Sequence, residues 1–260
     1  MIYFLDFKKE INTIVQKLSS NEFSFGDEKN GFENVISIMQ STIAERDAVI
    51  SLLLNMDDEE IVVSISYLYN NALNDAVFIN DLFKMSAFKF IAYEIVLYTL
   101  TNLFLLDKFD LVYTIISKKY YTSNYSQVEE VSFYYTFGIR MEHACNIKKM
   151  GVDSDDNCAV TKLIENRLNQ DLVSLSDLKS CDLLINDCAV LANDEYTPYF
   201  IISPADITLA MIIVKRIASD DSIVLSLLNL KNKSELRQKL NDLGNIVVYK
   251  RMRIISHFVS

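Results

Sequence analysis

Few residues of this chain combine a reactive type with a spacing that could do chemistry. Of the 260 residues, 2 are His and 4 are Cys. His143 and Cys145 could supply two zinc ligands, with Cys158 and one further cysteine completing the set. Zinc sites use short, paired ligand spacings that are missing here, so the sequence predicts no metal site. No spacing favours a Cys–His pair for nucleophilic catalysis either.

The other two cysteines, Cys181 and Cys188, lie two helical turns apart, and we expect them to pack in a core. All four cysteines are irregularly spaced, which does not indicate a disulfide framework. The first residues, Met1 to Asp6, reach a charge too early for the apolar part of a secretory signal. The sequence therefore predicts reduced thiols and a cytoplasmic protein.

The C-terminal segment holds one more candidate pair, Arg251 and His257, with five residues between them. This spacing resembles the Arg-x(4–6)-His pattern of HEPN-type ribonucleases. The resemblance implies a helical protein in which the Arg and the His act on an RNA backbone in a dimer cleft. Met252 stands where that family usually has a polar residue. The alternative interpretation is a solvated basic tail or an interface strip.

Composition excludes two broad classes of function. The 5 glycines are all isolated, so neither common nucleotide-binding fingerprint is present, and we expect no cofactor. The net charge is −10, and a uniformly acidic surface repels nucleic-acid phosphates and anionic lipids. Nucleic-acid binding is therefore unlikely outside the basic C-terminal segment, and we expect no membrane association.

The charge is unevenly distributed along the chain. From residue 207 onward there are nine basic residues against four acidic ones, a local charge of +5. This asymmetry indicates that the basic end meets an acidic surface, which belongs either to a protein partner or to a second copy of the chain. The candidate interface residues are Tyr249, Lys250, Arg251 and Arg253.

The fold class follows from the scarcity of turn-forming residues. The chain has 5 Gly and 2 Pro, where average usage gives roughly 18 and 13. Few such residues mean few tight turns and hairpins. The sequence therefore predicts an all-α fold of stacked antiparallel helical hairpins without a sizeable sheet. We expect one domain over 1–260, with a possible division near residue 151.

The stretch from Phe88 to Tyr120 is predicted to be the centre of the fold, as two helices joined by a polar break at 106–110. Apolar residues with helical spacing cover opposite sides of the first helix, which predicts burial on both sides. The alternative is a transmembrane helix, but Glu94 and Asn102 interrupt its apolar run. We therefore expect a core helix.

Periodicity and capping residues predict the other elements. Capping positions are Asp57 with Glu60, Ser174 with Asp177, and Asn232. Loops are expected at 19–31, 121–125 and 193–200, and the segment 245–260 could be strand or helix. The predicted helices cover 6–18, 32–56, 61–73, 76–85, 126–149, 153–169, 174–191, 207–218, 220–230 and 234–243.

One resemblance covers about 93–200. The aromatic hairpin from Tyr93 to Tyr121, the sequences Leu175-Ser-Asp-Leu178 and Cys181-Asp-Leu-Leu184, and Tyr196-Thr-Pro-Tyr199 are similar to the helical C-terminal regions of bacterial anti-phage defence proteins. In those proteins the regions follow an effector or nucleotide-binding domain. The resemblance implies a sensing or assembly role and transfers no catalytic residue.

These observations favour a non-enzymatic helical interaction, sensor or adaptor subunit of a cytoplasmic complex. The absence of a catalytic set, the 50% hydrophobic content and the charge asymmetry motivate this hypothesis. A protein partner or a homo-oligomer is expected. Two alternatives stay open, namely the ribonuclease that would use Arg251 and His257, and a small-molecule sensor with a pocket lined by Tyr and Phe between helices.

Overall fold

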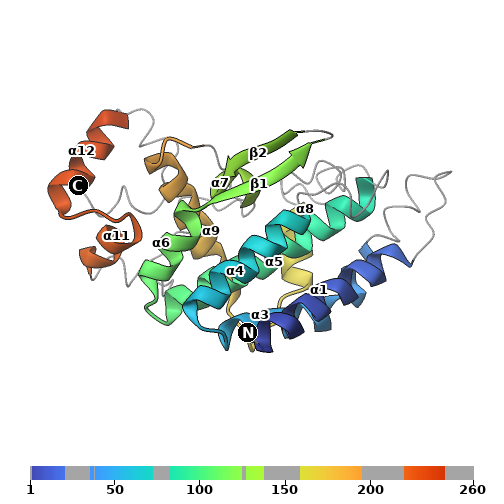
Figure 1. Cartoon of the computed structure of the whole chain (residues 1–260). Helices are drawn as coiled ribbons and strands as arrows, with labels where there is room; N and C mark the ends of the chain where they lie inside the picture. The colour runs from blue at the N-terminus through green and yellow to red at the C-terminus, as the bar shows by residue number, and fades with distance from the viewer. Residues whose placement is uncertain are drawn as a thin grey trace. The chain divides into compact units, whose positions relative to one another are not determined.

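The computed structural model describes residues 2–20, 36–37, 39–72, 82–124, 127–137, 159–194 and 220–243. Within these ranges the protein is mostly helical, with one two-stranded sheet of order β1-β2 (Figure 1). The predicted all-α class is therefore confirmed. Several predicted segments lie wholly or mostly outside the described residues, among them the helix at 207–218, the loops at 19–31 and 193–200, and the C-terminal stretch 245–260.

The chain divides into two compact units, each assembled from three stretches of sequence. Unit 1 comprises 1–99, 119–131 and 139–169, and unit 2 comprises 100–118, 132–138 and 170–260. The chain leaves unit 1 for the last time after Asn169. The predicted division near residue 151 falls among residues that the structure does not describe.

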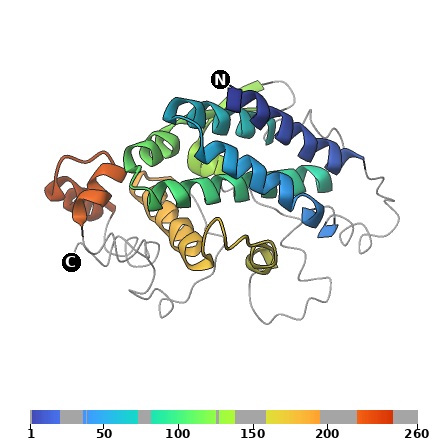
Figure 2. The same cartoon turned by 90° about the horizontal axis from the view of Figure 1, so that it is seen from below.

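Unit 1 is built on helices that pack side by side. Figures 1 and 2 show α1, α3 and α4 next to one another, and each of the three contacts the other two. The predicted apolar face of the first helix is confirmed, since Phe7, Ile11, Ile14 and Leu18 are buried. The elements of unit 1 are α1 (Ile2–Ser19), α3 (Ile43–Leu54), α4 (Asp58–Ala72), the part of α5 (Leu82–Leu105) up to Thr99, β1 (Lys119–Asn124), β2 (Gln127–Ser132) up to Val131, and α8 (Ala159–Asn166).

The helix α5 has the two-sided burial that its sequence predicts. Both predicted apolar rows are buried except at Leu105. In the described part of the chain, Ala87–Leu105 is the one stretch long and apolar enough to cross a membrane, and 83% of it is buried in the protein. The core helix of a soluble protein has the same property. The separate helix expected at 76–85 is wrong at its C-terminal end, because Leu82 to Met85 are the first residues of α5.

Two paired strands replace most of the loop and the start of the helix that the sequence predicts after Tyr120, whereas residues 133–137 are helical as predicted. The helix α6 (Phe109–Ser117) ends before Lys118, whose backbone is extended. β1 then covers 121–124 of the predicted loop, and β2 covers 127–129 of the predicted helix start. Tyr120 is buried with its ring edge-to-face on Tyr69 of α4, at 5.0 Å between centroids, whereas Tyr121 is exposed. Burial of Tyr120 against α4, with its neighbour Tyr121 exposed, favours strand here over the local capping pattern.

Unit 2 contains α6, α7 (Phe133–Phe137), α9 (Leu175–Leu191), α11 (Asp221–Leu227) and α12 (Lys233–Leu243). α11 contacts α6 and α12, and α12 contacts α9. In α9 every residue from Asp177 to Leu191 is buried except Lys179. The predicted N-cap of α9 at Ser174 is confirmed, because the Ser174 Oγ accepts a hydrogen bond from the Asp177 N–H at 3.1 Å.

The other two predicted caps are confirmed as well. The Asp57 carboxylate accepts a hydrogen bond from the Glu60 N–H at 2.8 Å, at the start of α4. The Asn232 side chain accepts one from the Glu235 N–H at 3.1 Å, at the start of α12. Each contact satisfies a donor that has no partner inside the first helical turn. The acidic run that begins at Asp57 therefore has a structural role.

Candidate functional site

All the residues that the sequence singles out for chemistry or for an interface lie outside the described part of the chain. These are the ribonuclease pair Arg251 and His257, the interface residues Tyr249, Lys250 and Arg253, and the zinc candidates His143, Cys145 and Cys158. Their roles stay predictions. Among the described residues, no group of three or more His, Cys, Asp or Glu side chains could hold a metal ion.

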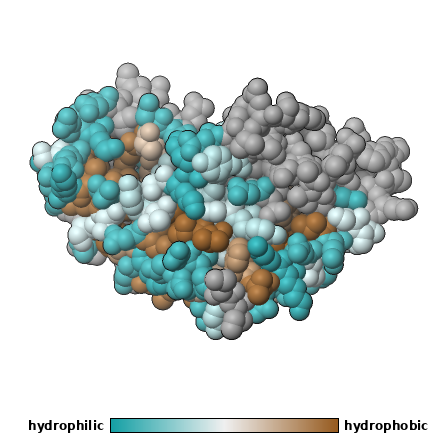
Figure 3. Space-filling model, viewed as in Figure 1, coloured by the Kyte–Doolittle hydropathy of each residue, from teal (hydrophilic) through white to brown (hydrophobic). Residues whose placement is uncertain are grey.

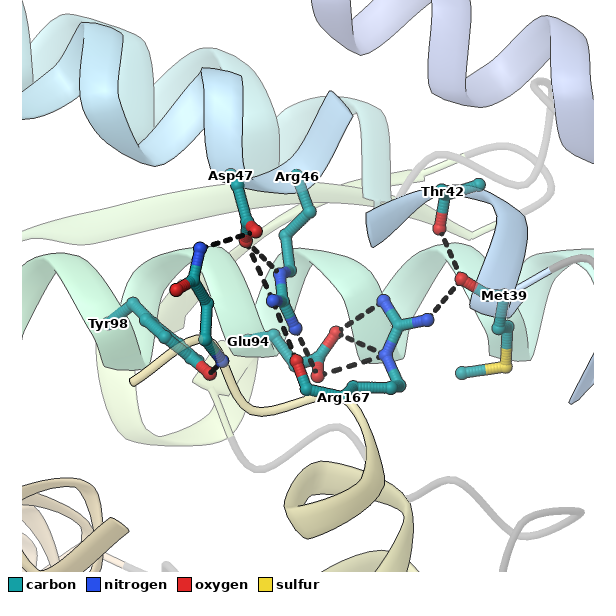
Figure 4. Close-up of polar contacts among 8 residues, drawn as sticks. Met39, Thr42, Arg46, Asp47, Glu94, Tyr98 and Arg167 are labelled. Atoms are coloured by element: carbon teal, nitrogen blue, oxygen red, sulfur yellow. Dashed lines mark hydrogen bonds and ion pairs between the residues drawn. The ribbon is translucent and has the colours of Figure 1, made fainter. Parts of the chain in front are cut away.

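The structure brings together a different set of ionisable residues, in the interior of unit 1. Arg46 from α3, Glu94 from α5 and Arg167, which follows α8, converge in one cluster (Figure 4). The side chains of Arg46 and Arg167 are 0% exposed and that of Glu94 is 1% exposed. A buried charge is tolerated when it is paired and hydrogen-bonded, which is the case for all three.

Glu94 is the centre of this ion cluster. Arg46 Nη1 donates to Glu94 Oε1 at 2.9 Å. Arg167 donates to the same carboxylate through Nε, at 3.0 Å from each oxygen, and through Nη2, at 2.8 Å from Oε2. Two guanidinium groups thus hold one carboxylate, and planar guanidinium groups suit this geometry better than ammonium groups.

The remaining guanidinium donors also have partners within unit 1. Arg46 donates to the Asp47 carboxylate through Nε at 2.9 Å and through Nη2 at 2.7 Å, and to the Arg167 carbonyl through Nη2 at 2.8 Å. Arg167 Nη1 donates to the carbonyl of Met39, which also accepts from the Thr42 hydroxyl at 2.7 Å. All six guanidinium nitrogens of the two arginines therefore donate to an acceptor, as Figure 4 shows.

Further contacts tie the segment after α8 to the same cluster. Asn169 donates through Nδ2 to Asp47 at 2.8 Å, and its N–H donates to the Tyr98 hydroxyl at 3.2 Å. The Arg46 guanidinium lies over the Tyr98 ring at 4.9 Å from the centroid. The N–H groups of Arg167 and Leu168 close a turn on the carbonyls at the end of α8, and the Asn169 N–H donates to a side chain instead of a backbone carbonyl. Side-chain contacts therefore hold this segment in place.

The charges of the cluster balance. Arg46 and Arg167 carry two positive charges, and Glu94 and Asp47 carry two negative ones. Burial disfavours the charged form of Arg46, but attraction to Glu94 and Asp47 outweighs it, and the pKa of Arg46 is raised. The cluster is neutral as a whole. The side chains of Arg46, Glu94 and Arg167 are closed to solvent, whereas that of Asp47 is 19% exposed. The geometry is suited to joining three parts of unit 1, and it leaves Glu94 and the two arginines out of reach of a substrate.

Sequence analysis missed this cluster, although one signal for it was present. Glu94 sits in the middle of an apolar helix, where an acidic residue is rarely buried without a cationic partner. That signal was used only against a membrane span. It could not identify the partners, because Arg46 and Arg167 lie 48 and 73 positions away in the sequence.

The two buried thiols of unit 2 are poor nucleophiles. Cys181 and Cys188 are free and buried, which confirms the prediction that they pack in the core. Burial raises the pKa of Cys181 to about 12, although a hydrogen bond with Thr101 opposes the shift. Burial also raises the pKa of Cys188, with a contribution from Asp187. A thiol needs its thiolate form to act as a nucleophile, so neither is suited to catalysis.

Comparison with known proteins does not assign the chain to a family. Neither a family model, nor a curated protein, nor a solved structure matches the chain.

Proposed function

We propose that this chain is a non-enzymatic helical interaction subunit of a cytoplasmic complex. The observation that carries the proposal is a series of exposed apolar side chains on three elements of unit 1. α1 contacts α4, and α4 contacts β1. The exposed side chains on these elements are Tyr3 (46% exposed) and Leu5 (68%) on α1, Val63 (43%) on α4, and Tyr121 (54%) on β1.

A single exposed apolar residue is ordinary, but neighbouring elements that all expose one favour contact with another protein. Tyrosine is also enriched at interfaces, where it supplies a large area at low entropy cost. The face in Figure 3 has hydrophobic areas next to hydrophilic ones. We call these four side chains, Tyr3, Leu5, Val63 and Tyr121, the exposed apolar set.

The buried ion cluster supports the non-enzymatic part of the proposal. Catalytic acids and bases need access to a substrate and a pKa suited to proton transfer. Glu94, Arg46 and Arg167 are instead buried and directed at one another. The free thiols of Cys181 and Cys188 agree with the reducing conditions of a cytoplasm.

The proposal is tested by photocrosslinking in the native cell. A photoreactive phenylalanine analogue at Leu5 or Val63 is expected to give one discrete covalent product with a partner protein or a second copy of the chain. The same analogue at Gln16, an exposed polar position of α1, serves as the matched control and is expected to give none. Light scattering on the purified chain distinguishes self-association from a separate partner. A monomer that crosslinks at none of these positions would contradict the proposal.

A further inference from the structure

Three aromatic rings and one ammonium group meet where the first turns of α1 pack on α4, within unit 1. The rings of Phe4 and Tyr67 are nearly perpendicular, at 86°, with centroids 6.0 Å apart. Lys8 Nζ lies 4.4 Å from the centroid of Phe4 and 4.8 Å from that of Tyr67. One cation thus faces two rings from different helices. We call Phe4 and Tyr67 the aromatic corner.

The third ring gives the corner a rigid support. Phe7 is fully buried, and its ring lies edge-on to Tyr67 at 6.2 Å and roughly parallel to Phe4 at 6.3 Å. Phe4, Lys8 and Tyr67 are only half-buried. The corner is therefore held in shape from the core side while its cation-facing side remains within reach of solvent.

The cation in this corner is held by ring faces. Among the described residues, the Lys8 ammonium forms no ion pair and no hydrogen bond, and its contacts there are with the rings of Phe4 and Tyr67. The chain also carries a net charge of −10, which attracts cations to its surface. Two perpendicular aromatic faces around one ammonium are the geometry by which proteins recognise quaternary and methylated ammonium groups.

We propose that the aromatic corner is a binding site for a quaternary or methylated ammonium group, and that Lys8 occupies it in the free protein. The Lys8 ammonium is strongly hydrated and sits on a flexible stem, so it can leave the corner for water at little cost. A methylated ammonium is more weakly hydrated and gains more from the same ring faces. The group could belong to a choline-like small molecule or to a methylated lysine side chain. The proposal does not depend on the exposed apolar set or on the proposed function.

The test is a titration with tetramethylammonium chloride, followed through the ring resonances of Phe and Tyr by NMR, with sodium chloride added to equal ionic strength. Lys8→Ala removes the internal occupant, and we expect it to tighten binding by about two- to five-fold relative to the unsubstituted chain. Lys9→Ala is the matched control, because Lys9 is the exposed neighbour on the same helix and should leave binding unchanged. Phe4→Ala and Tyr67→Ala are expected to abolish saturable binding.

Two further titrations sharpen the result. Choline is compared with its uncharged isostere 3,3-dimethylbutanol, and only choline should bind if the rings recognise charge. Choline is then compared with a peptide that carries trimethyl-lysine, and the tighter of the two identifies the source of the ammonium. The absence of saturable shifts in the folded Lys8→Ala variant would overturn the proposal, as would equal binding of the uncharged isostere. Circular dichroism establishes that each variant is folded.

Discussion

Arg167 holds Glu94 with two of its nitrogens, at 2.8–3.0 Å, although the residues are 73 positions apart in the sequence. Arg46 holds the same carboxylate from α3 at 2.9 Å. Burial removes the solvent that would otherwise screen these charges, so the contacts matter more than surface ion pairs do. The ion cluster therefore connects α3, α5 and the segment after α8, and its removal has measurable consequences for unit 1.

Substitution of Glu94 by Gln is expected to lower the free energy of unfolding by about 3–5 kcal/mol, because two buried guanidinium groups lose their shared counter-charge. Urea denaturation followed by circular dichroism measures the loss. The control is Glu45→Gln, which breaks the ion pair with Lys17, whose side chain is 39% exposed against 16% for that of Glu45. Breaking this partly exposed pair should cost about 1 kcal/mol. Equal losses in the two variants would show that the cluster contributes no more than a partly exposed pair.

The double variant Glu94→Gln with Arg167→Met should be less destabilised than the two single losses added together. Each single change leaves a buried charge with fewer partners, whereas the double change removes one charge of each sign. A double-mutant cycle is expected to give a coupling energy of about 1–3 kcal/mol. Additive losses would mean that the two side chains do not interact in solution.

The adjacent residues Tyr120 and Tyr121 test the hairpin. Tyr120 is buried against Tyr69, and Tyr121 is more than half exposed. We expect Tyr120→Ala to cost about 3–5 kcal/mol, from lost burial and the cavity that it leaves. Tyr121→Ala should change the free energy of unfolding by about 0.5 kcal/mol or less. Similar costs at both positions would contradict the strand alternation of β1.

Stability should fall as the pH rises above about 9. The ordinary pKa of a cysteine thiol is 9.0, and burial raises the pKa of Cys181 to about 12 in the folded protein. Burial also raises the pKa of Cys188 and of Tyr69. The unfolded chain then loses these protons more readily than the folded one, so alkaline pH favours unfolding.

Urea denaturation at a series of pH values from 7 to about 11 measures this dependence. The stability contributed by the neutral thiols is fully present below pH 9 and is lost as the pH rises toward the folded pKa. The variant with Cys181→Ala and Cys188→Ala should have a smaller slope, because only the tyrosines still contribute. A stability that does not change over this range would contradict the prediction.

The cap of α9 offers a local test. Ser174→Ala removes the acceptor for the Asp177 N–H, and we expect a loss of about 1 kcal/mol in the free energy of unfolding. Ser174→Asn keeps an acceptor at the same position and should retain most of the stability. Ser51→Ala, at an exposed position within α3, is the control for a serine without a capping role. Its effect should lie within about 0.5 kcal/mol of zero.

Local sequence signals were sufficient for most of the helices. The apolar face of α1, the two buried rows of α5 and the caps at Asp57, Ser174 and Asn232 all follow from contacts between residues three or four positions apart. Such contacts depend on the helix alone, and the sequence therefore contains what is needed to predict them.

The hairpin could not be predicted in this way. Residues 126–129 form a sequence typical of a helix start, and the aromatic residues before them resemble an exposed loop. Burial of Tyr120 against Tyr69, 51 positions earlier in the chain (120 − 69), competes with that local preference. Strand formation depends on such non-local packing more than helix formation does, which is why tertiary contacts decided this segment.

The sequence by itself determined that this is a helical protein with an apolar central helix that Glu94 interrupts. Only the tertiary structure decided which cations neutralise that carboxylate, and that Phe4 and Tyr67 enclose Lys8. The physical reason is that helix periodicity acts over a few residues, whereas charge pairing and ring contacts depend on distances in space. Those distances are set by how the helices pack, and no spacing in the sequence records them.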